Sequence, residues 1–573
     1  MLKFIQHLRE RYQALEAHGQ STIPEEVYQA RINQQILAEA YLKRLVVWPD
    51  DSARPLQIAV VGPTQVGKST VVNLLLQQTI AVVSPLAGYT VHAQAVLHQV
   101  TEPECAGFAQ YFGRFQQLPL AALNPGRLDA YGLGISTANS PILPACVLWD
   151  TPDFDSINSV AYQEGLLRTL ALADVLVLVV SKEKYADLSV WRMLELLAPL
   201  QQPTLICLNK LKPDMEKALL PDIASRWHAL HGHQPDAVLP LYYDIQHSPE
   251  WPQDHADSLM RLARKARGKT PEHHAAKLIQ RHWDDWVAPV RAEIKVREHW
   301  QALIDTAIEH AMSDYQQRFL NRPDHYETFQ SAIATLLVLI EVPGFATWVA
   351  NTRRVLTWPM RRLFGSFGKH RQTTQELPLL AQLGEHLLME LNDCLLERQE
   401  QQPHHGWQAL ASRLRQQRTA LNNAFQDEAV QYHAEFQSEI DQAARQLHQH
   451  LQQHPMLLNG LRATRLTTDA AALALTFHAG GIGLHDLLLA PAMLSITSYL
   501  TESILGSRVY SIEANLKRKQ RETVEQRLFG MLREQLGQLP DAFPDTAFFN
   551  LTAAQLSDAQ AHLPSKKHGL RIL

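Results

Sequence analysis

The feature that most constrains this chain is a nine-residue segment, Gly62-Pro-Thr-Gln-Val-Gly-Lys-Ser-Thr70. It follows the apolar run Leu56 to Val61 and precedes an apolar stretch with helical character. A strand, a tight loop and a helix in this order match the phosphate-binding pattern G-x-x-x-x-G-K-[ST]. Backbone N–H groups of such a loop, together with the positive end of the helix, converge on phosphate oxygens. The segment 62–70, called the phosphate loop below, therefore predicts binding of a nucleoside triphosphate.

Individual residues of the phosphate loop have expected roles. Gly62 and Gly67 let the backbone fold tightly, Lys68 is expected to reach the β- and γ-phosphates, and Ser69 is expected to bind Mg²⁺. The predicted nucleotide contacts in the loop are Gly62, Gln65, Val66, Gly67, Lys68, Ser69 and Thr70.

Two further segments carry the residue types that a nucleotide switch requires. Thr90 lies in the loop after the helix that follows the phosphate loop, where its hydroxyl and amide could sense the γ-phosphate. Asp150 ends the apolar run Ala145 to Trp149, at the strand edge where doubly wound sheets bind ligands. We predict Ser69, Thr90 and Asp150 as the Mg²⁺ site, and Lys68, Thr90 and Asp150 as the catalytic residues.

A third segment, Leu208-Asn-Lys-Leu-Lys-Pro-Asp214, follows another apolar run. It matches the first half of the guanine-reading pattern N-K-x-D, so Asn209 and Lys210 are expected to contact the base. The acid of that pattern is replaced by Lys212, and the nearest acid is Asp214. The sequence therefore leaves both GTP and ATP open as the nucleotide.

The order of these motifs resembles that of the translation-factor class of P-loop GTPases, in particular its Era-like and bacterial dynamin-like branches. The resemblance covers about a third of the chain and implies GTP and Mg²⁺ as ligands, with GTP hydrolysis as the activity. It departs from the family at Asp153, where D-x-x-G becomes D-x-x-D, and at Phe154, where relatives carry a catalytic glutamine. Because a phenyl group cannot orient water, we expect slow intrinsic turnover and self-association of two nucleotide domains, as in dynamin-like relatives.

Short apolar runs that alternate with helical stretches extend from Leu56 to about Asp244. This alternation predicts an α/β domain at residues 54–246 with a mostly parallel sheet covered on both faces. The expected strands are Leu56–Val61, Ala93–Val100, Ala145–Trp149, Val175–Val180, Thr204–Leu208 and Ala237–Tyr243. Residues 103–140 are interpreted as an insertion without an assigned role.

The rest of the chain has the pattern of a large all-α region. Residues 1–50 are expected to form helices that dock with the C-terminal helices, and residues 250–455 to form long amphipathic helices of a bundle or stalk. One apolar stripe within them consists of Leu410, Leu414, Leu421, Phe425, Tyr432, Phe436, Ile440, Leu447 and Leu451. Residues 456–573 are expected to contain an apolar hairpin and the C-terminal helices.

Two apolar segments, residues 332–350 and 470–505, have basic residues close to them. The first contains Glu341 and Pro343, so a simple membrane-spanning helix is not expected there. The second could turn at Gly480-Gly481-Ile-Gly483 and contact membrane lipid, or form a buried hairpin within the helical region. The sequence leaves these two alternatives open.

Charge and cysteine content restrict the partners and the compartment. A net charge of −5 argues against a general nucleic-acid binder, so no specific nucleic-acid partner is expected. Four scattered cysteines and the lack of an apolar N-terminal signal core predict a cytoplasmic protein, with peripheral contact at the inner face of the membrane if the hairpin meets lipid.

Two functions follow as expectations. The first is a Mg²⁺-dependent, dynamin-like GTPase that couples its nucleotide state to movement of a helical stalk and to membrane contact. The second is a soluble nucleotide-dependent scaffold, or a regulatory GTPase associated with the ribosome or another complex, with little turnover.

Overall fold

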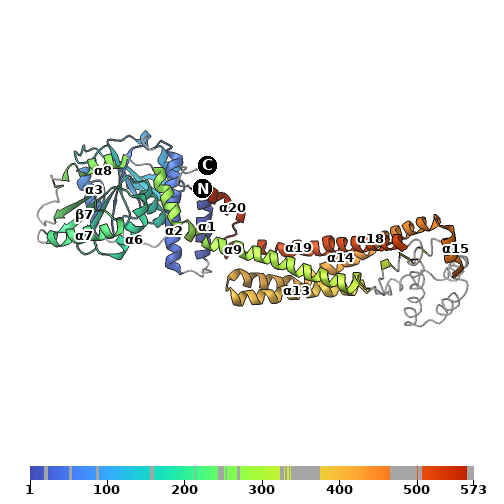
Figure 1. Cartoon of the computed structure of the whole chain (residues 1–573). Coiled ribbons are helices and arrows are strands. Elements are labelled where there is room, and N and C mark those ends of the chain that lie inside the picture. The colour runs from blue at the N-terminus through green and yellow to red at the C-terminus, as the bar shows by residue number, and fades with distance from the viewer. Residues whose placement is uncertain are drawn as a thin grey trace. The chain divides into compact units, whose positions relative to one another are not determined.

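A computed structural model of the chain divides it into two compact units (Figure 1). The first contains Met1–Ile294 and Pro544–Leu573, and the second contains Lys295–Phe543. The structure describes residues 1–17, 24–50, 54–84, 89–154, 160–212, 215–242, 251–252, 255–267, 271–322, 328–329, 332–333, 336, 375–464, 500 and 506–563.

The centre of the first unit is an eight-stranded sheet with the order β3-β4-β2-β5-β1-β6-β7-β8. All neighbouring strands are parallel except β2 and β5, which are antiparallel. The strands are β1 (Leu56–Val61), β2 (Gln94–His98), β3 (Gln116–Pro119), β4 (Ala130–Ile135), β5 (Cys146–Asp150), β6 (Val175–Ser181), β7 (Thr204–Leu211) and β8 (Ala237–Tyr242). The predicted α/β fold with a mostly parallel sheet is confirmed, and the six expected strands are present.

Helices cover both faces of this sheet, because the strands carry apolar side chains on both sides. Helices α3 (Lys68–Leu76) and α8 (Ser258–Arg267) share one apolar core with residues such as Val60 and Val177. The other face packs against α4 (Gly107–Phe112), α5 (Val160–Leu172), α6 (Leu188–Leu197) and α7 (Glu216–His231). The strands β1 and β5 end at the same edge of the sheet. Doubly wound sheets bind their ligands at this carboxyl edge.

Residues 103–140, predicted as an insertion, extend the sheet. They form α4, β3 and β4, and β4 pairs with β2 over Gln94–Leu97 and Gly132–Ile135. Tyr131 on β4 stacks on Phe112 of α4, with ring centroids 4.4 Å apart. The insertion is therefore part of the core of the first unit.

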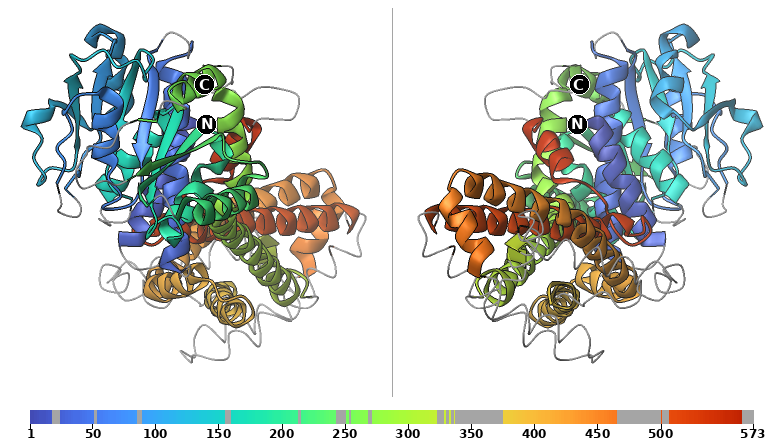
Figure 2. Two further views of the ribbon diagram at one scale, coloured as in Figure 1. Left: turned by 90° about the vertical axis from the view of Figure 1, so that its left-hand side faces the viewer. Right: turned by 90° about the vertical axis from the view of Figure 1, so that its right-hand side faces the viewer.

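The N-terminal helices α1 (Leu2–Ala17) and α2 (Glu25–Val47) pack in the first unit, together with the start of α9 (Pro271–Tyr315). The Tyr12 hydroxyl donates to the backbone oxygen of Trp286 over 2.8 Å, and Arg11 pairs with Asp545 at 3.0 Å. Figure 2 shows α1 and α2 in dark blue beside the first turns of α9 in green. Helix α20 (Ala553–Ala561) belongs to the same unit. Docking of residues 1–50 with the C-terminal helices stays a prediction.

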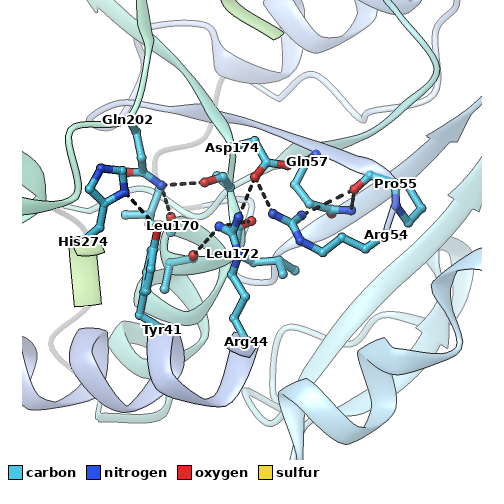
Figure 3. A network of polar contacts seen from close by, with 12 residues as sticks. Tyr41, Arg44, Arg54, Pro55, Gln57, Leu170, Leu172, Asp174, Gln202 and His274 are labelled. Carbon is cyan, nitrogen blue, oxygen red and sulfur yellow. Dashed lines mark hydrogen bonds and ion pairs between the residues drawn. The ribbon is translucent and has the colours of Figure 1, made fainter. Parts of the chain in front are cut away.

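A polar network fixes α2 to the end of α5 and to the start of β1 (Figure 3). Arg44 donates to Asp174 over 2.8 Å and to the backbone oxygens of Ala171 and Leu172. The last carbonyl groups of a helix have no partner inside it, so a guanidinium at this place satisfies them. Asp174 also accepts from Arg54 and from the backbone N–H of Gln57. Helix α2 is thereby attached to the sheet domain.

The second unit is helical. The part of α9 after Ile294 is followed by the π-helical segment η7 (Gln316–Leu320), α13 (Glu376–Gln401), α14 (His405–Gln452) and α15 (Pro455–Thr464). Next come α18 (Gly506–Thr523), the π-helical segment η8 (Val524–Phe529), α19 (Gly530–Gly537) and the 3₁₀ segment η9 (Leu539–Ala542). The apolar stripe predicted for residues 410–451 is buried along α14. The predicted large helical region is confirmed.

The two apolar segments, 332–350 and 470–505, lie almost entirely outside the described residues. Within the described part of the chain, no helix combines the length and the apolar character needed to cross a bilayer. The choice between membrane contact and a buried hairpin stays open.

Candidate nucleotide-binding site

The phosphate loop connects β1 to α3 and requires glycine at two places. Gly67 has φ of +89°, and a Cβ atom there would lie 2.6 Å from the side-chain nitrogen of Asn209. A Cβ atom on Gly62 would lie 2.2 Å from the backbone oxygen of Val179 on β6. Only glycine allows both the left-handed backbone and these close approaches. Helix α3 begins at Lys68, within the phosphate loop, whereas the sequence indicated a helical stretch after Thr70.

Asn209 and Lys210, near the end of β7, hold the phosphate loop, although β6 lies between β7 and β1 in the sheet. The Asn209 amide donates to the backbone oxygen of Val66 over 2.8 Å, and the Lys210 ammonium donates to the backbone oxygen of Gln65 over 2.7 Å. Gln65 and Lys210 both have positive φ, of 63° and 57°. Sequence patterns predicted these two residues as base contacts, whereas the structure gives them a second role as supports of the loop. Their contact with the base stays a prediction.

The Lys68 ammonium is engaged by an acid in this structure. It donates to the carboxylate of Asp153 and, over 3.1 Å, to the backbone oxygen of Pro63. Thr64 donates its hydroxyl proton to the second carboxylate oxygen of Asp153 over 2.6 Å. The sequence motif itself did not indicate this ion pair. The sequence signal for the ion pair was the departure from the family pattern, in which an acid, Asp153, replaces glycine.

Ser69 and Asp150, two of the three predicted Mg²⁺ ligands, are hydrogen-bonded to each other. The Ser69 hydroxyl donates to Asp150 Oδ2 over 2.7 Å, and Asp150 Oδ1 is buried without a hydrogen-bond partner among the described residues. Burial raises the pKa of Asp150 to about 6, and the negative charge of Asp153 adds to the rise, whereas the Ser69 hydrogen bond and the charge of Lys68 act against it. A hydroxyl and a partnerless carboxylate oxygen fit the oxygen ligands that Mg²⁺ prefers.

The other predicted residues lie around this edge of the sheet. Thr90 is buried in the segment before β2, but the preceding residues 85–88 are outside the described part. Phe154 packs against the apolar core, so its ring belongs to the fold and not to water positioning. Lys212 is exposed just after β7, and Asp214 is outside the described part. The Mg²⁺ roles of Ser69, Thr90 and Asp150 stay predictions.

A phosphate loop between β1 and α3, at the carboxyl edge of a doubly wound sheet, defines a P-loop nucleotide-binding domain. Residues 57–210 match the family model described as "50S ribosome-binding GTPase". The match runs from β1 into β7 and includes the phosphate loop, Asp150 and Asn209. This part of the chain is therefore a P-loop GTPase domain, as the sequence resemblance predicted, and such a domain implies GTP binding.

Other comparisons concern the whole chain. Similar solved structures include two of an oligomerised bacterial dynamin pair, which are described as providing a mechanism for long-range sensing and tethering of membranes. One has 12% sequence identity, a TM-score of 0.40 and coverage of 96% of both chains. The other has 14% identity, a TM-score of 0.35 and coverage of 94% of both chains. No curated protein matches the chain.

Proposed function

We propose that the chain is a Mg²⁺-dependent switch protein that binds and hydrolyses GTP. The observation that carries this proposal is the pairing of Ser69 with Asp150 over 2.7 Å beside the phosphate loop, within a segment that matches a GTPase family. The loop amides and the Lys68 ammonium would bind the β- and γ-phosphates, and Ser69 and Asp150 would hold the metal. Mg²⁺ would neutralise charge on the phosphate oxygens when bound.

Nucleotide binding is tested by isothermal titration with GTP, GDP and ATP, each in Mg²⁺ and in chelator. Binding of GTP and GDP that weakens in chelator supports the proposal. Ser69→Ala is expected to remove the Mg²⁺ dependence, while Ser189→Ala, at the start of α6, serves as a control for loss of a hydroxyl elsewhere. Failure of all three nucleotides to bind would contradict the proposal.

Hydrolysis is proposed to be slow in a single domain. Phe154, which packs against the core, offers no group to position water, so a group from another loop, a cation or a second subunit must do so. Self-association of two GTPase domains would supply that group. Single-turnover rates that rise with protein concentration would support this pairing, and rates independent of concentration would contradict it.

A dynamin-like organisation is proposed for the whole chain, in which the nucleotide state moves the helical unit and the chain contacts membrane lipid. The long helices α13 and α14 and the apolar segment 470–505 with its basic flanks support this proposal. Such a protein would act in the cytoplasm and at the inner face of the membrane. Flotation with anionic liposomes tests the lipid contact: a chain that stays at the bottom of the gradient with every nucleotide would contradict it.

A second candidate function is a nucleotide-dependent scaffold or regulatory GTPase with little turnover. The description of the matching family as ribosome-binding favours this candidate for the nucleotide domain. The two candidates differ in a turnover assay. Strong stimulation by lipid supports the dynamin-like protein, whereas stoichiometric binding without hydrolysis, together with co-sedimentation with ribosomes, supports the regulatory one.

A further inference from the structure

The Lys68–Asp153 ion pair places a carboxylate on the ammonium group that is expected to bind phosphate. The two side chains come from different elements, Lys68 from the first turn of α3 and Asp153 from the segment after β5. Both are nearly inaccessible to solvent, with 5% and 9% of their side-chain surface exposed. Charges that face each other in such a site interact more strongly than they would in water. The ion pair therefore stabilises one defined arrangement of the site, in which the Lys68 ammonium contacts the Asp153 carboxylate.

Two further contacts hold Asp153 in this state. Thr64, itself a residue of the phosphate loop, donates to the second carboxylate oxygen over 2.6 Å. The hydroxyl of the buried Tyr162, on α5, donates to the backbone oxygen of Asp153 over 2.6 Å. The carboxylate is thus bound by a hydroxyl and an ammonium from one phosphate loop, which are the groups that would otherwise face an anionic ligand.

We propose that the Asp153 carboxylate is a built-in competitor for the nucleotide: it occupies Lys68 in the nucleotide-free protein, and it must leave before a γ-phosphate can bind. This inference rests on the proposed nucleotide binding at the phosphate loop. Asp153 is then a specificity-determining residue, because its charge opposes a triphosphate more than a diphosphate.

The direction of this preference follows from charge. When a diphosphate binds, Lys68 must release the Asp153 carboxylate. A triphosphate also places its γ-phosphate close to the displaced Asp153 carboxylate. Like charges in a poorly solvated site repel each other. Neutralising Asp153 should therefore tighten triphosphate binding more than diphosphate binding. It should also destabilise the nucleotide-free protein, because the buried ammonium loses its partner.

The test compares the wild-type chain with Asp153→Asn, which keeps the shape of the side chain and removes its charge. Dissociation constants are measured by isothermal titration, in Mg²⁺, for GDP and for a non-hydrolysable GTP analogue. The expected result for Asp153→Asn is at least about tenfold tighter binding of the analogue and a smaller gain for GDP; tenfold corresponds to about 1.4 kcal/mol. Without nucleotide, the melting temperature of Asp153→Asn should lie below that of the wild type. With saturating analogue, the melting temperatures of the two proteins should be equal.

Two more variants make the test specific. Thr64→Ala removes one contact to Asp153 and leaves the ion pair, so a tightening of about threefold is expected, about 0.7 kcal/mol. Glu183→Gln removes a negative charge just after β6, at the same edge of the sheet, where Glu183 pairs with Lys182 at 3.5 Å. Its affinities should equal those of the wild type. If Asp153→Asn fails to fold, Thr64→Ala decides the question.

The outcomes separate the inference from the function on which it rests. A wild-type chain that binds neither nucleotide overturns the proposed function. If the wild-type chain binds nucleotide and Asp153→Asn has the same affinities, the competitor role is overturned. If Asp153→Asn does not fold, unchanged affinities of Thr64→Ala overturn it. A purely structural role for Asp153 would lower the melting temperature equally with and without the analogue, and this result would also overturn it.

Discussion

Arg168 on α5 donates to the carboxylate of Glu39 on α2 over 2.9 Å, and both side chains are buried. Arg168 also pairs with Glu164 at 2.7 Å, and Arg9 on α1 pairs with Glu39 at 2.7 Å. Alternating charges on three helices thus form one buried network within the first unit. The attraction between opposite charges offsets part of the desolvation penalty of burying them, and the network links the N-terminal helices to α5.

Glu39→Ala should destabilise the first unit. Its removal leaves the guanidinium groups of Arg9 and Arg168 without this shared partner, and breaking a buried pair costs about 3 kcal/mol or more. Hydrogen exchange of backbone amides in α2 measures the effect locally, in a chain where unfolding has more than one step. Glu26→Ala is the matched control: Glu26 is on the same helix, is 86% exposed and lies 3.9 Å from Arg192, so a change within about 0.5 kcal/mol is expected.

The same network predicts a pH dependence. Burial raises the pKa of Glu164, but the charge and hydrogen bond of Arg168 and the charges of Arg9 and Arg114 outweigh it, so that the pKa lies below its usual value of 4.5. The unfolded chain therefore binds the proton first as the pH falls, and stability falls with it. The contribution of Glu164 is complete above about pH 4.5 and is lost as the pH falls through the lower, folded-state pKa.

The measurement for Glu164 is the free energy of local opening of α5, obtained from hydrogen exchange of its backbone amides as a function of pH, for the wild type and for Glu164→Gln. The difference between the two curves should be constant near neutral pH and shrink toward acid pH, since glutamine does not titrate. A difference that grows as the pH falls would contradict the assigned sign.

The sequence predicts those strands whose own residues form an apolar run. Val175–Val180 is apolar throughout and Thr204–Leu208 is apolar after its first residue, because parallel strands are buried on both faces. In contrast, β3 reads Gln-Gln-Leu-Pro and β4 contains Gly132 and Gly134. Glutamine, proline and glycine give no strand signal, and these strands exist because β4 pairs with β2 and β3 pairs with β4.

The site divides in the same way. Residue identity and spacing located the phosphate loop, Asp150 and Asn209, because phosphate and Mg²⁺ recognition needs fixed residue types at fixed places. The pairing of Lys68 with Asp153 and the support of the loop by Asn209 join residues that are distant in sequence. Such contacts depend on how strands lie side by side, which no local pattern states.

Base selection can be tested at Lys212. This exposed residue stands where the GTPase pattern carries an acid that accepts hydrogen bonds from guanine. Lys212→Asp should raise the preference for GTP over ATP by about tenfold or more, since hydrogen bonds to a charged group contribute about 1.5–3 kcal/mol. Lys217→Asp makes the same charge change at an exposed position of α7 and should leave the preference as it is. Equal GTP-to-ATP ratios in wild type and Lys212→Asp would argue against base contact at this position.

The helical unit contains a buried acid, Glu376, whose one oxygen accepts from Tyr315, Tyr432 and Gln520 at 2.7, 3.0 and 2.9 Å. Burial first, and the charge of Glu376 second, raise the pKa of Tyr432 well above its usual value, so its phenol stays protonated and donates. Glu376→Leu would remove the buried acceptor that these three donors share, and a loss of about 3 kcal/mol is expected.

Hydrogen exchange in α13 and α14 measures the effect of Glu376→Leu. Glu385→Leu, on the same helix and 57% exposed, is the control and should change protection little. Equal loss of protection in both variants would show that the buried acid has no special role in holding these helices.

The most direct test of the central claim is the affinity of Lys68→Ala for GTP, measured by isothermal titration in Mg²⁺. Because the variant also removes the ion pair with Asp153, the comparison is repeated in an Asp153→Asn background, and Lys217→Ala controls for loss of a lysine elsewhere. We expect Lys68→Ala to weaken GTP binding at least about a hundredfold, about 2.8 kcal/mol. Unchanged affinity in both backgrounds would contradict the claim that this loop binds the phosphates.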